Sequence, residues 1–254
     1  MNERLTSMST APGEPLPPIS QILKDLHEHC SQALTQTLTV EYSQQLADAY
    51  LFVSDLETWT GALSTHDDRR LFEYAAQEYL LSILGVCQGQ YRNSFKSLRL
   101  VLELCLQGIL LSTDLLSQSE WLKGELDTNW TRITDDQSGV LSKRFCSAFF
   151  PELSDNVPHF ATLSKSLYRE LSECIHGNVP IKIPLPTTLA FSEDAFLLWV
   201  EKTGTLRLVI TFFLSMRYLR SLSQGHTIKL EPIIMQHLGH IAAIRTSFGG
   251  PVVT

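Results

Sequence analysis

Residues 91–112 constrain the fold more than any other part of the sequence. Their apolar side chains recur at the i, i+3, i+4 and i+7 spacing of an α-helix, and further leucines extend the apolar surface almost around it. These residues are Leu98, Val101, Leu102, Cys105, Leu106, Ile109 and Leu110, together with Leu100, Leu104 and Leu111. A helix that is apolar on nearly every side must be covered by other elements, so we expect it at the centre of a helical bundle.

Helical spacing recurs along most of the chain, whereas the period-2 alternation of strands is almost absent. The sequence therefore predicts an all-α fold, with residues 1–18 as a flexible proline-rich arm and residues 19–254 as a single helical domain. Longer helices are expected over residues 19–35, 40–63, 71–86, 91–112, 140–149, 158–176, 192–222 and 231–246, with a break over residues 85–89 and an interruption near Gly204.

Several local features add detail to this prediction. Ser117 and Glu120 have the spacing of a capping box at the start of a short helix within residues 113–136. Pro232 is expected in the first turn of the last helix, where proline is tolerated, and His237 and His240 would share one face of it. Residues 66–70 read as a charged turn, and residues 179–188 contain three prolines and should be extended.

Composition limits the class of protein. The 254 residues carry a net charge of −7, which argues against a protein that coats nucleic acid, because such proteins are basic. The five cysteines show no paired spacing, which predicts a reducing, cytoplasmic setting. No apolar run reaches the about 20 residues of a membrane span. His27, His29 and Cys30 lie close together, but positions 27 and 29 point to different sides of a helix and no second ligand pair is placed nearby, so no metal and no cofactor is predicted.

Arg169 and His176 form the one candidate catalytic pair. They are seven residues apart, so on a helix they project from the same side, with Ser172 and Lys165 near them and the apolar stripe opposite. A guanidinium can clamp a phosphate, and an imidazole can act as general acid or base near neutral pH. This pair would suit cleavage of RNA through its own 2′-hydroxyl without a metal.

The same spacing also has a plain structural explanation. A histidine in the last turn of a helix is favoured by the helix dipole without any catalytic role, and Gly177 followed by Pro180 ends the predicted helix here. A second arginine–histidine pair, Arg220 and His226, encloses Gly225 and should straddle a helix end. Phosphate-binding loops, zinc-protease and serine-hydrolase motifs are absent from the sequence.

Three segments together resemble the HEPN-like all-helical superfamily, in the subfamily with an LSxxIHG signature. They are GQYRNSFKSLRLVLE over residues 89–103, SEWLKG over residues 119–124, and LYRELSECIHG over residues 167–177. In the first segment Arg99 precedes Glu103 by four residues, and the third contains the Arg-x6-His spacing. The resemblance covers about residues 75–178 and leaves helices over about residues 190–247 outside it.

The resemblance implies a core of about four helices that commonly dimerises. In active members, the arginine and histidine of two protomers meet at the interface and cleave RNA, often in prokaryotic toxin or phage-defence systems. Active motifs usually carry a small polar residue after the arginine, whereas this chain has Glu170, whose carboxylate is expected to repel phosphate. Other members act without catalysis, as scaffolds or partner subunits.

Two hypotheses follow from these observations. The chain is either an endoribonuclease with His176 as acid/base, Arg169 as phosphate clamp, and Lys165 and Ser172 assisting, or a non-catalytic helical interaction module within a larger complex. In both cases we expect a homodimer or a subunit of a larger assembly, with RNA as the possible substrate and no membrane. The spacing of Arg169 and His176 favours the first, and Glu170 and the acidic net charge favour the second.

Arg99 and Glu103 lie on a helix that is apolar nearly all round, so at least one should be partly buried. Buried charges persist only when they are paired and hydrogen-bonded. Their contact with each other is in the weaker order, arginine first. We therefore expect partners from another helix, in the region of Tyr168 to His176, so that the pair orients the candidate site.

Overall fold

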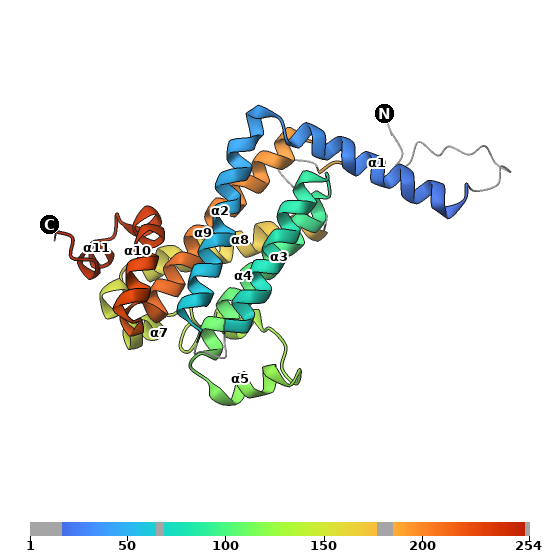
Figure 1. Ribbon diagram of the computed structural model, residues 1–254. Coiled ribbons are helices and arrows are strands. Elements are labelled where there is room, and N and C mark those ends of the chain that lie inside the picture. Colours follow the sequence, from blue (N-terminus) through green and yellow to red (C-terminus); the bar gives the residue numbers. More distant parts are fainter. Residues whose placement is uncertain (1–16, 65–68, 177–184, 252–254) are drawn as a thin grey trace.

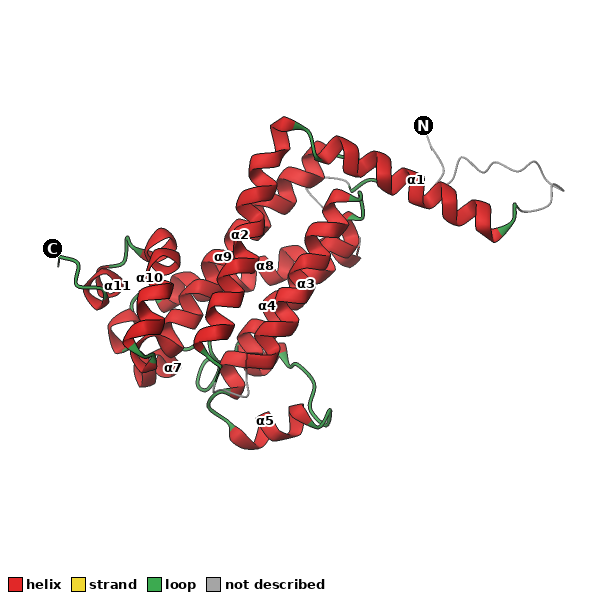
Figure 2. Cartoon of the chain, viewed as in Figure 1, coloured by secondary structure: helices red, strands yellow, loops and turns green. Residues whose placement is uncertain are grey.

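The computed structural model describes residues 17–64, 69–176 and 185–251, and within these ranges it contains helices and turns but no strand (Figures 1 and 2). This confirms the predicted all-α class. The α-helices are α1 (Ile19–Thr37), α2 (Val40–Ala62), α3 (Arg69–Cys87), α4 (Tyr91–Leu111), α5 (Leu115–Leu122), α6 (Trp130–Ile133), α7 (Lys143–Phe149), α8 (Val157–His176), α9 (Glu193–Tyr218), α10 (Gln224–Leu238) and α11 (Ala242–Ser247). Two short 3₁₀ helices, η1 (Pro151–Leu153) and η2 (Leu219–Ser221), follow α7 and α9.

Helices α3 and α4 form a tight hairpin through a turn at residues 88–90 (Figure 1). The Ser82 hydroxyl donates to the Ser94 carbonyl at 3.0 Å, and the Ser94 hydroxyl donates back to the Ser82 carbonyl at 2.8 Å. Gly85 lies inside α3, where a Cβ would come within 2.7 Å of the Ser94 hydroxyl. The expected break at residues 85–89 is therefore wrong at its start, because Gly85 permits close helix packing and does not end the helix.

Helix α4 is buried along most of its length, as its apolar pattern predicts. It packs against α3, α8 and α9, which share one apolar core. Phe160 of α8 stacks on Phe212 of α9 with ring centroids 3.8 Å apart. The Trp199 indole of α9 donates to the Ser82 hydroxyl of α3 at 2.8 Å. These contacts fix the position of α8, which carries the candidate residues.

Helix α9 runs without interruption through Gly204, so the expected break there is wrong. Glycine costs a helix interior about 1 kcal/mol relative to alanine. Residues such as Trp199, Leu206, Phe212 and Phe213 are completely buried along the same helix. Their burial stabilises α9 by far more than the glycine costs, so tertiary packing overrides the local preference.

The C-terminal region also differs from expectation. In place of one helix over residues 231–246, α10 begins at Gln224, where the Ser223 side chain caps it, and α11 follows after a break at Gly239. Pro232 therefore lies inside α10 and not in a first turn. His240 falls after the end of α10, so it does not share a helix face with His237.

Other local predictions are corrected in the connections. Helix α5 is capped by the Asp114 side chain, which accepts from the Ser117 backbone N–H at 3.1 Å, so the capping box of Ser117 and Glu120 is wrong. Helix α7 starts at Lys143 because Ser142 caps it, later than the expected residue 140. Residues 66–68 of the expected charged turn and residues 179–184 of the expected extended segment lie outside the described residues.

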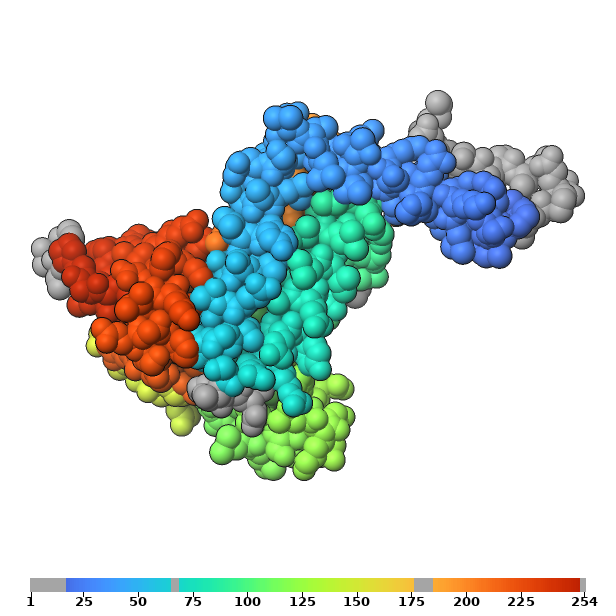
Figure 3. Space-filling model, viewed as in Figure 1, coloured from blue at the N-terminus to red at the C-terminus, as the bar shows by residue number. Residues whose placement is uncertain are grey.

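Helix α1 extends from the rest of the described chain, as Figure 3 shows, with Ala33 and Thr37 as its buried residues. Its first turns expose apolar side chains, including Leu23 and Leu26. The Thr37 hydroxyl lies 3.4 Å from the Cys87 carbonyl at the end of α3. The C-terminal part of α1 is thus held against the hairpin, near the start of α4.

Candidate functional site

Helix α8 carries the candidate residues, and Lys165 and Arg169 lie exposed on it. The Arg169 side chain is 70% exposed, and its Nε lies 3.8 Å from the Glu173 carboxylate one turn further on. An exposed pair at this distance is weak, so the Arg169 guanidinium can turn to another anion at little cost. His176 is the last residue of α8. Its side chain lies outside the described part of the structure.

Lys165 and Ser172, the two residues expected to assist Arg169, differ in what they can offer to a substrate. The Lys165 ammonium is half exposed and lies 3.7 Å from the Asp136 carboxylate, which is itself almost fully exposed. The Ser172 hydroxyl donates to the Tyr168 backbone carbonyl at 2.7 Å. Ser172 can therefore offer a substrate only its oxygen lone pairs, whereas Lys165 can offer its charge.

The carboxylate of Glu170 is turned toward α9. It accepts a hydrogen bond from the Lys202 ammonium at 2.6 Å, and Lys202 also binds Glu201 at 2.8 Å. Burial disfavours the charged form of Lys202, but the hydrogen bonds from both carboxylates outweigh it and raise the pKa of Lys202. The expected repulsion of phosphate by Glu170 is thus reduced but not removed, because one buried ammonium is shared between the carboxylates of Glu170 and Glu201.

Arg99 and Glu103 of α4 meet Tyr168 of α8, the contact that the sequence predicts. The Arg99 guanidinium donates to the Tyr168 hydroxyl at 2.6 Å, lies 4.5 Å from the centre of its ring, and lies 3.4 Å from the Glu103 carboxylate. Trp130 of α6 stacks on the Tyr168 ring, with the two ring centroids 3.9 Å apart. Arg99, Glu103, Trp130 and Tyr168 thus form one cluster. Burial, with the charge of Glu103, raises the pKa of Tyr168. The cluster fixes α8 one residue before Arg169.

Removing one charge from this cluster should destabilise the protein measurably. The side chains of Arg99 and Glu103 are 25% and 17% exposed, so Arg99→Met and Glu103→Gln are each expected to lower the free energy of unfolding by about 1 to 2 kcal/mol. Urea denaturation measures this loss. Glu73→Gln is the matched control, since Arg69 and Glu73 have the same spacing and order but are 42% and 47% exposed. Equal midpoints for Glu73→Gln and Glu103→Gln would show that the cluster is an ordinary surface pair.

Three contacts that shape this region were not predicted from the sequence. Arg92 of α4 donates from Nη1 to the carbonyls of Cys174 and Ile175, at 3.5 and 3.3 Å. These carbonyls belong to the last turn of α8, which lacks partners within the helix and carries the negative end of the dipole. The stacking of Trp130 and the pairing of Lys202 are the other two. All three contacts link segments that are far apart in the sequence, so local spacing could not predict them.

Other types of site are not indicated in the part of the chain that the structure covers. None of its histidine, cysteine, aspartate and glutamate side chains gather in threes in a way that could hold a metal ion. None of the described helices is both long and apolar enough to cross a membrane. Comparisons with protein-family models, curated proteins and solved structures return no match. The HEPN-like resemblance therefore stands on the three sequence segments alone.

Proposed function

We propose that this chain is a metal-independent endoribonuclease of a prokaryotic toxin or phage-defence system. The observation that carries the proposal is the exposure of Arg169 on α8, where its side chain is 70% exposed and points away from the core, two turns before His176. The pairing of Glu170 with Lys202 supports it, because it reduces the repulsion of a phosphate by the carboxylate that follows Arg169 in the sequence.

The chemistry assigns one role to each residue. The 2′-hydroxyl oxygen of RNA attacks the adjacent phosphorus and the bond to the 5′ oxygen breaks, which leaves a 2′,3′-cyclic phosphate and a 5′-hydroxyl. Arg169 binds the phosphate oxygens, whose charge is stabilised in the transition state, and Lys165 adds positive charge nearby. His176 takes the proton from the 2′-hydroxyl or gives one to the 5′ oxygen. A homodimer would supply two copies of His176, one for each transfer.

Incubation of the purified protein with total RNA in EDTA tests this function. We expect cleavage by the wild type, loss of cleavage in His176→Ala and Arg169→Ala, and a dimer in light scattering at micromolar concentration. His159→Ala is the matched control, because His159 is exposed at the other end of the same helix. Cleavage that is absent from the wild type, or equal in wild type and His176→Ala, would exclude the nuclease.

A non-catalytic interaction module is the second candidate, and an exposed apolar surface favours it. Tyr74, Leu81 and Leu84 lie along one face of α3 and are each about half exposed, at 50%, 54% and 49%. Leu115 and Leu116 of α5 are 78% and 70% exposed. Apolar side chains gathered on one helix face are typical of a protein-binding surface. Intact RNA together with a stable dimer or complex in the experiment above would favour this module.

A further inference from the structure

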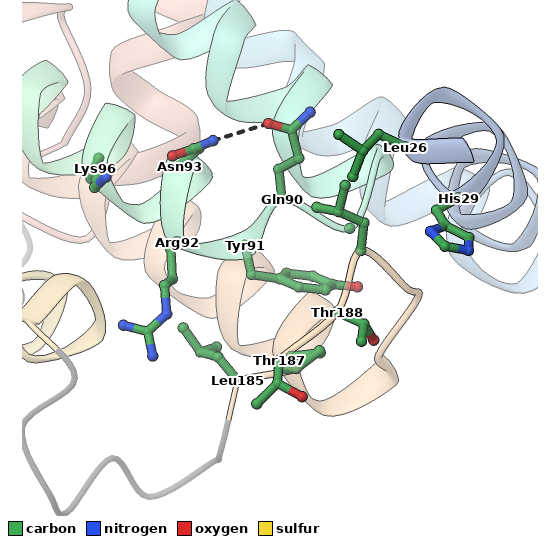
Figure 4. A pocket seen from close by; sticks show the side chains of 13 residues that line it. Leu26, His29, Gln90, Tyr91, Arg92, Asn93, Lys96, Leu185, Thr187 and Thr188 are labelled. Carbon is green, nitrogen blue, oxygen red and sulfur yellow. Dashed lines mark hydrogen bonds between the residues drawn. The ribbon is translucent and has the colours of Figure 1, made fainter. Parts of the chain in front are cut away.

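A pocket lies at the start of α4, beside the exposed half of α1 (Figure 4). Its volume is about 470 Å³, and it is bounded by residues of α1, by the first turns of α4 and by residues 185–189. This volume is within the range of small-molecule sites, which is about 300 to 1,000 Å³. Gly89 forms part of the wall with a φ of +71°, and a Cβ there would come within 2.8 Å of the Ala190 backbone. The wall is therefore closely packed at this point.

The charges around the pocket are of one sign. Arg92 and Lys96 line it from α4, whereas none of its described lining residues is an aspartate or a glutamate. This is unusual in a chain with a net charge of −7. Lys96 is exposed, and within the described residues it makes no hydrogen bond or ion pair. Its ammonium is thus available to a ligand, while Arg92 is partly engaged with the end of α8.

The rest of the wall is mixed, with the apolar Leu26, Leu185 and Leu189 beside the polar Gln90, Asn93, Thr187 and Thr188. Leu185 is 8% exposed, and Leu26 of α1 is 39% exposed. Tyr91 is held in place because its hydroxyl donates to the Ser192 carbonyl at 3.1 Å and accepts from the Ser192 N–H at 2.8 Å. Its side chain is only 2% exposed, so Tyr91 supports the pocket from behind and offers a ligand little surface. A pocket with a partly apolar wall and one free ammonium suits an anion with an apolar body.

We propose that this pocket binds a small carboxylic acid with an apolar body. The carboxylate pairs with Lys96, with Arg92 adding positive charge, and the apolar part covers Leu26, Leu185 and Leu189. A hydrophilic ion such as phosphate fits less well, because it would leave the leucine side chains of the wall in contact with water. The proposal does not depend on cleavage of RNA, because it uses neither Arg169 nor His176.

Calorimetric titration of the full chain at low salt tests the ligand class with matched probes. Octanoate is expected to bind at least about tenfold more tightly than octanamide, which has the same chain without the charge, and than acetate, which has the charge without the chain. Inorganic phosphate and adenosine monophosphate are expected to bind more weakly than octanoate. Absence of octanoate binding at millimolar concentration, equal binding of octanamide, or tighter binding of either phosphate would overturn the proposal.

Two variants tie the binding to this pocket. Lys96→Gln is expected to weaken octanoate binding about tenfold, and Leu26→Glu should weaken it at least as much, because it places a carboxylate in the wall. Both side chains are exposed, so thermal melts should confirm intact folding. Lys123→Gln is the control, since Lys123 is equally exposed but lies on α5's C-terminal cap, away from the pocket. Equal affinities for Lys96→Gln and Lys123→Gln would place octanoate elsewhere and contradict the assignment.

Discussion

Asp55→Ala is expected to lower the free energy of unfolding by about 3 to 5 kcal/mol, because it leaves a buried arginine without its carboxylate. Asp55 of α2 accepts a hydrogen bond from Nε of Arg207 of α9, and the two side chains are only 7% and 11% exposed. Burial raises the pKa of Asp55, and the guanidinium opposes this rise. Removing the carboxylate leaves Arg207 buried, with only a long contact of 3.5 Å to the Asp48 carbonyl.

Chemical denaturation of three variants separates this pair from an ordinary charge effect. Asp155→Ala removes one member of an exposed pair with Lys143, whose side chains are 102% and 58% exposed, and should change stability by less than about 0.5 kcal/mol. Asp55→Leu combined with Arg207→Met removes both charges and should be markedly more stable than Asp55→Ala, because no uncompensated charge remains. If the double variant is as unstable as Asp55→Ala, lost packing and not charge explains the effect.

The sequence predicts helices well where one local pattern dominates. The all-round apolar pattern of residues 91–112 correctly predicts a central buried helix, because that pattern has few other structural solutions. The predictions at Gly204 and Pro232, an interrupted helix and a helix start, are both wrong for one reason. Both are local helix breakers, but each lies in a helix stabilised by distant segments, since α9 packs against α4 and α8, and α10 packs against α2 and α9.

Around the candidate site, too, local patterns could be predicted from the sequence, whereas contacts between distant segments could not. Helical spacing alone places Lys165, Arg169, Ser172 and His176 on one side of a helix, and the need to pair Arg99 predicts a contact with the neighbourhood of Tyr168. The pairing of Glu170 with Lys202 could not be predicted, because the two lie 32 residues apart on helices whose relative placement depends on the whole core. The same holds for Asp55 and Arg207, which are 152 residues apart.

His237 of α10 lies in an environment that disfavours its charged form. It lines a cavity of about 180 Å³ with Arg207 and Asp48, and its Nε2 is buried without a hydrogen-bond partner among the described residues. Burial, together with the positive charge of Arg207, lowers the pKa of His237 from 6.5 to about 4. Asp48 offers only limited compensation, because its carboxylate accepts a hydrogen bond from Gln44 at 2.8 Å and is exposed.

This shift predicts a loss of stability on acidification. The folded protein binds the His237 proton more weakly than the unfolded chain, so the stabilisation is complete above pH 6.5 and is lost as the pH falls toward 4. Each pKa unit is worth about 1.4 kcal/mol, and partial solvent access reduces the total to about 2 kcal/mol.

Urea denaturation at pH 7 and at pH 4.5 should show this loss in the wild type and a smaller one in His237→Gln. His27→Gln, at an exposed position on α1, should keep the wild-type slope. Parallel pH profiles for the wild type and His237→Gln would mean that His237 is protonated as readily in the folded protein as in the unfolded chain.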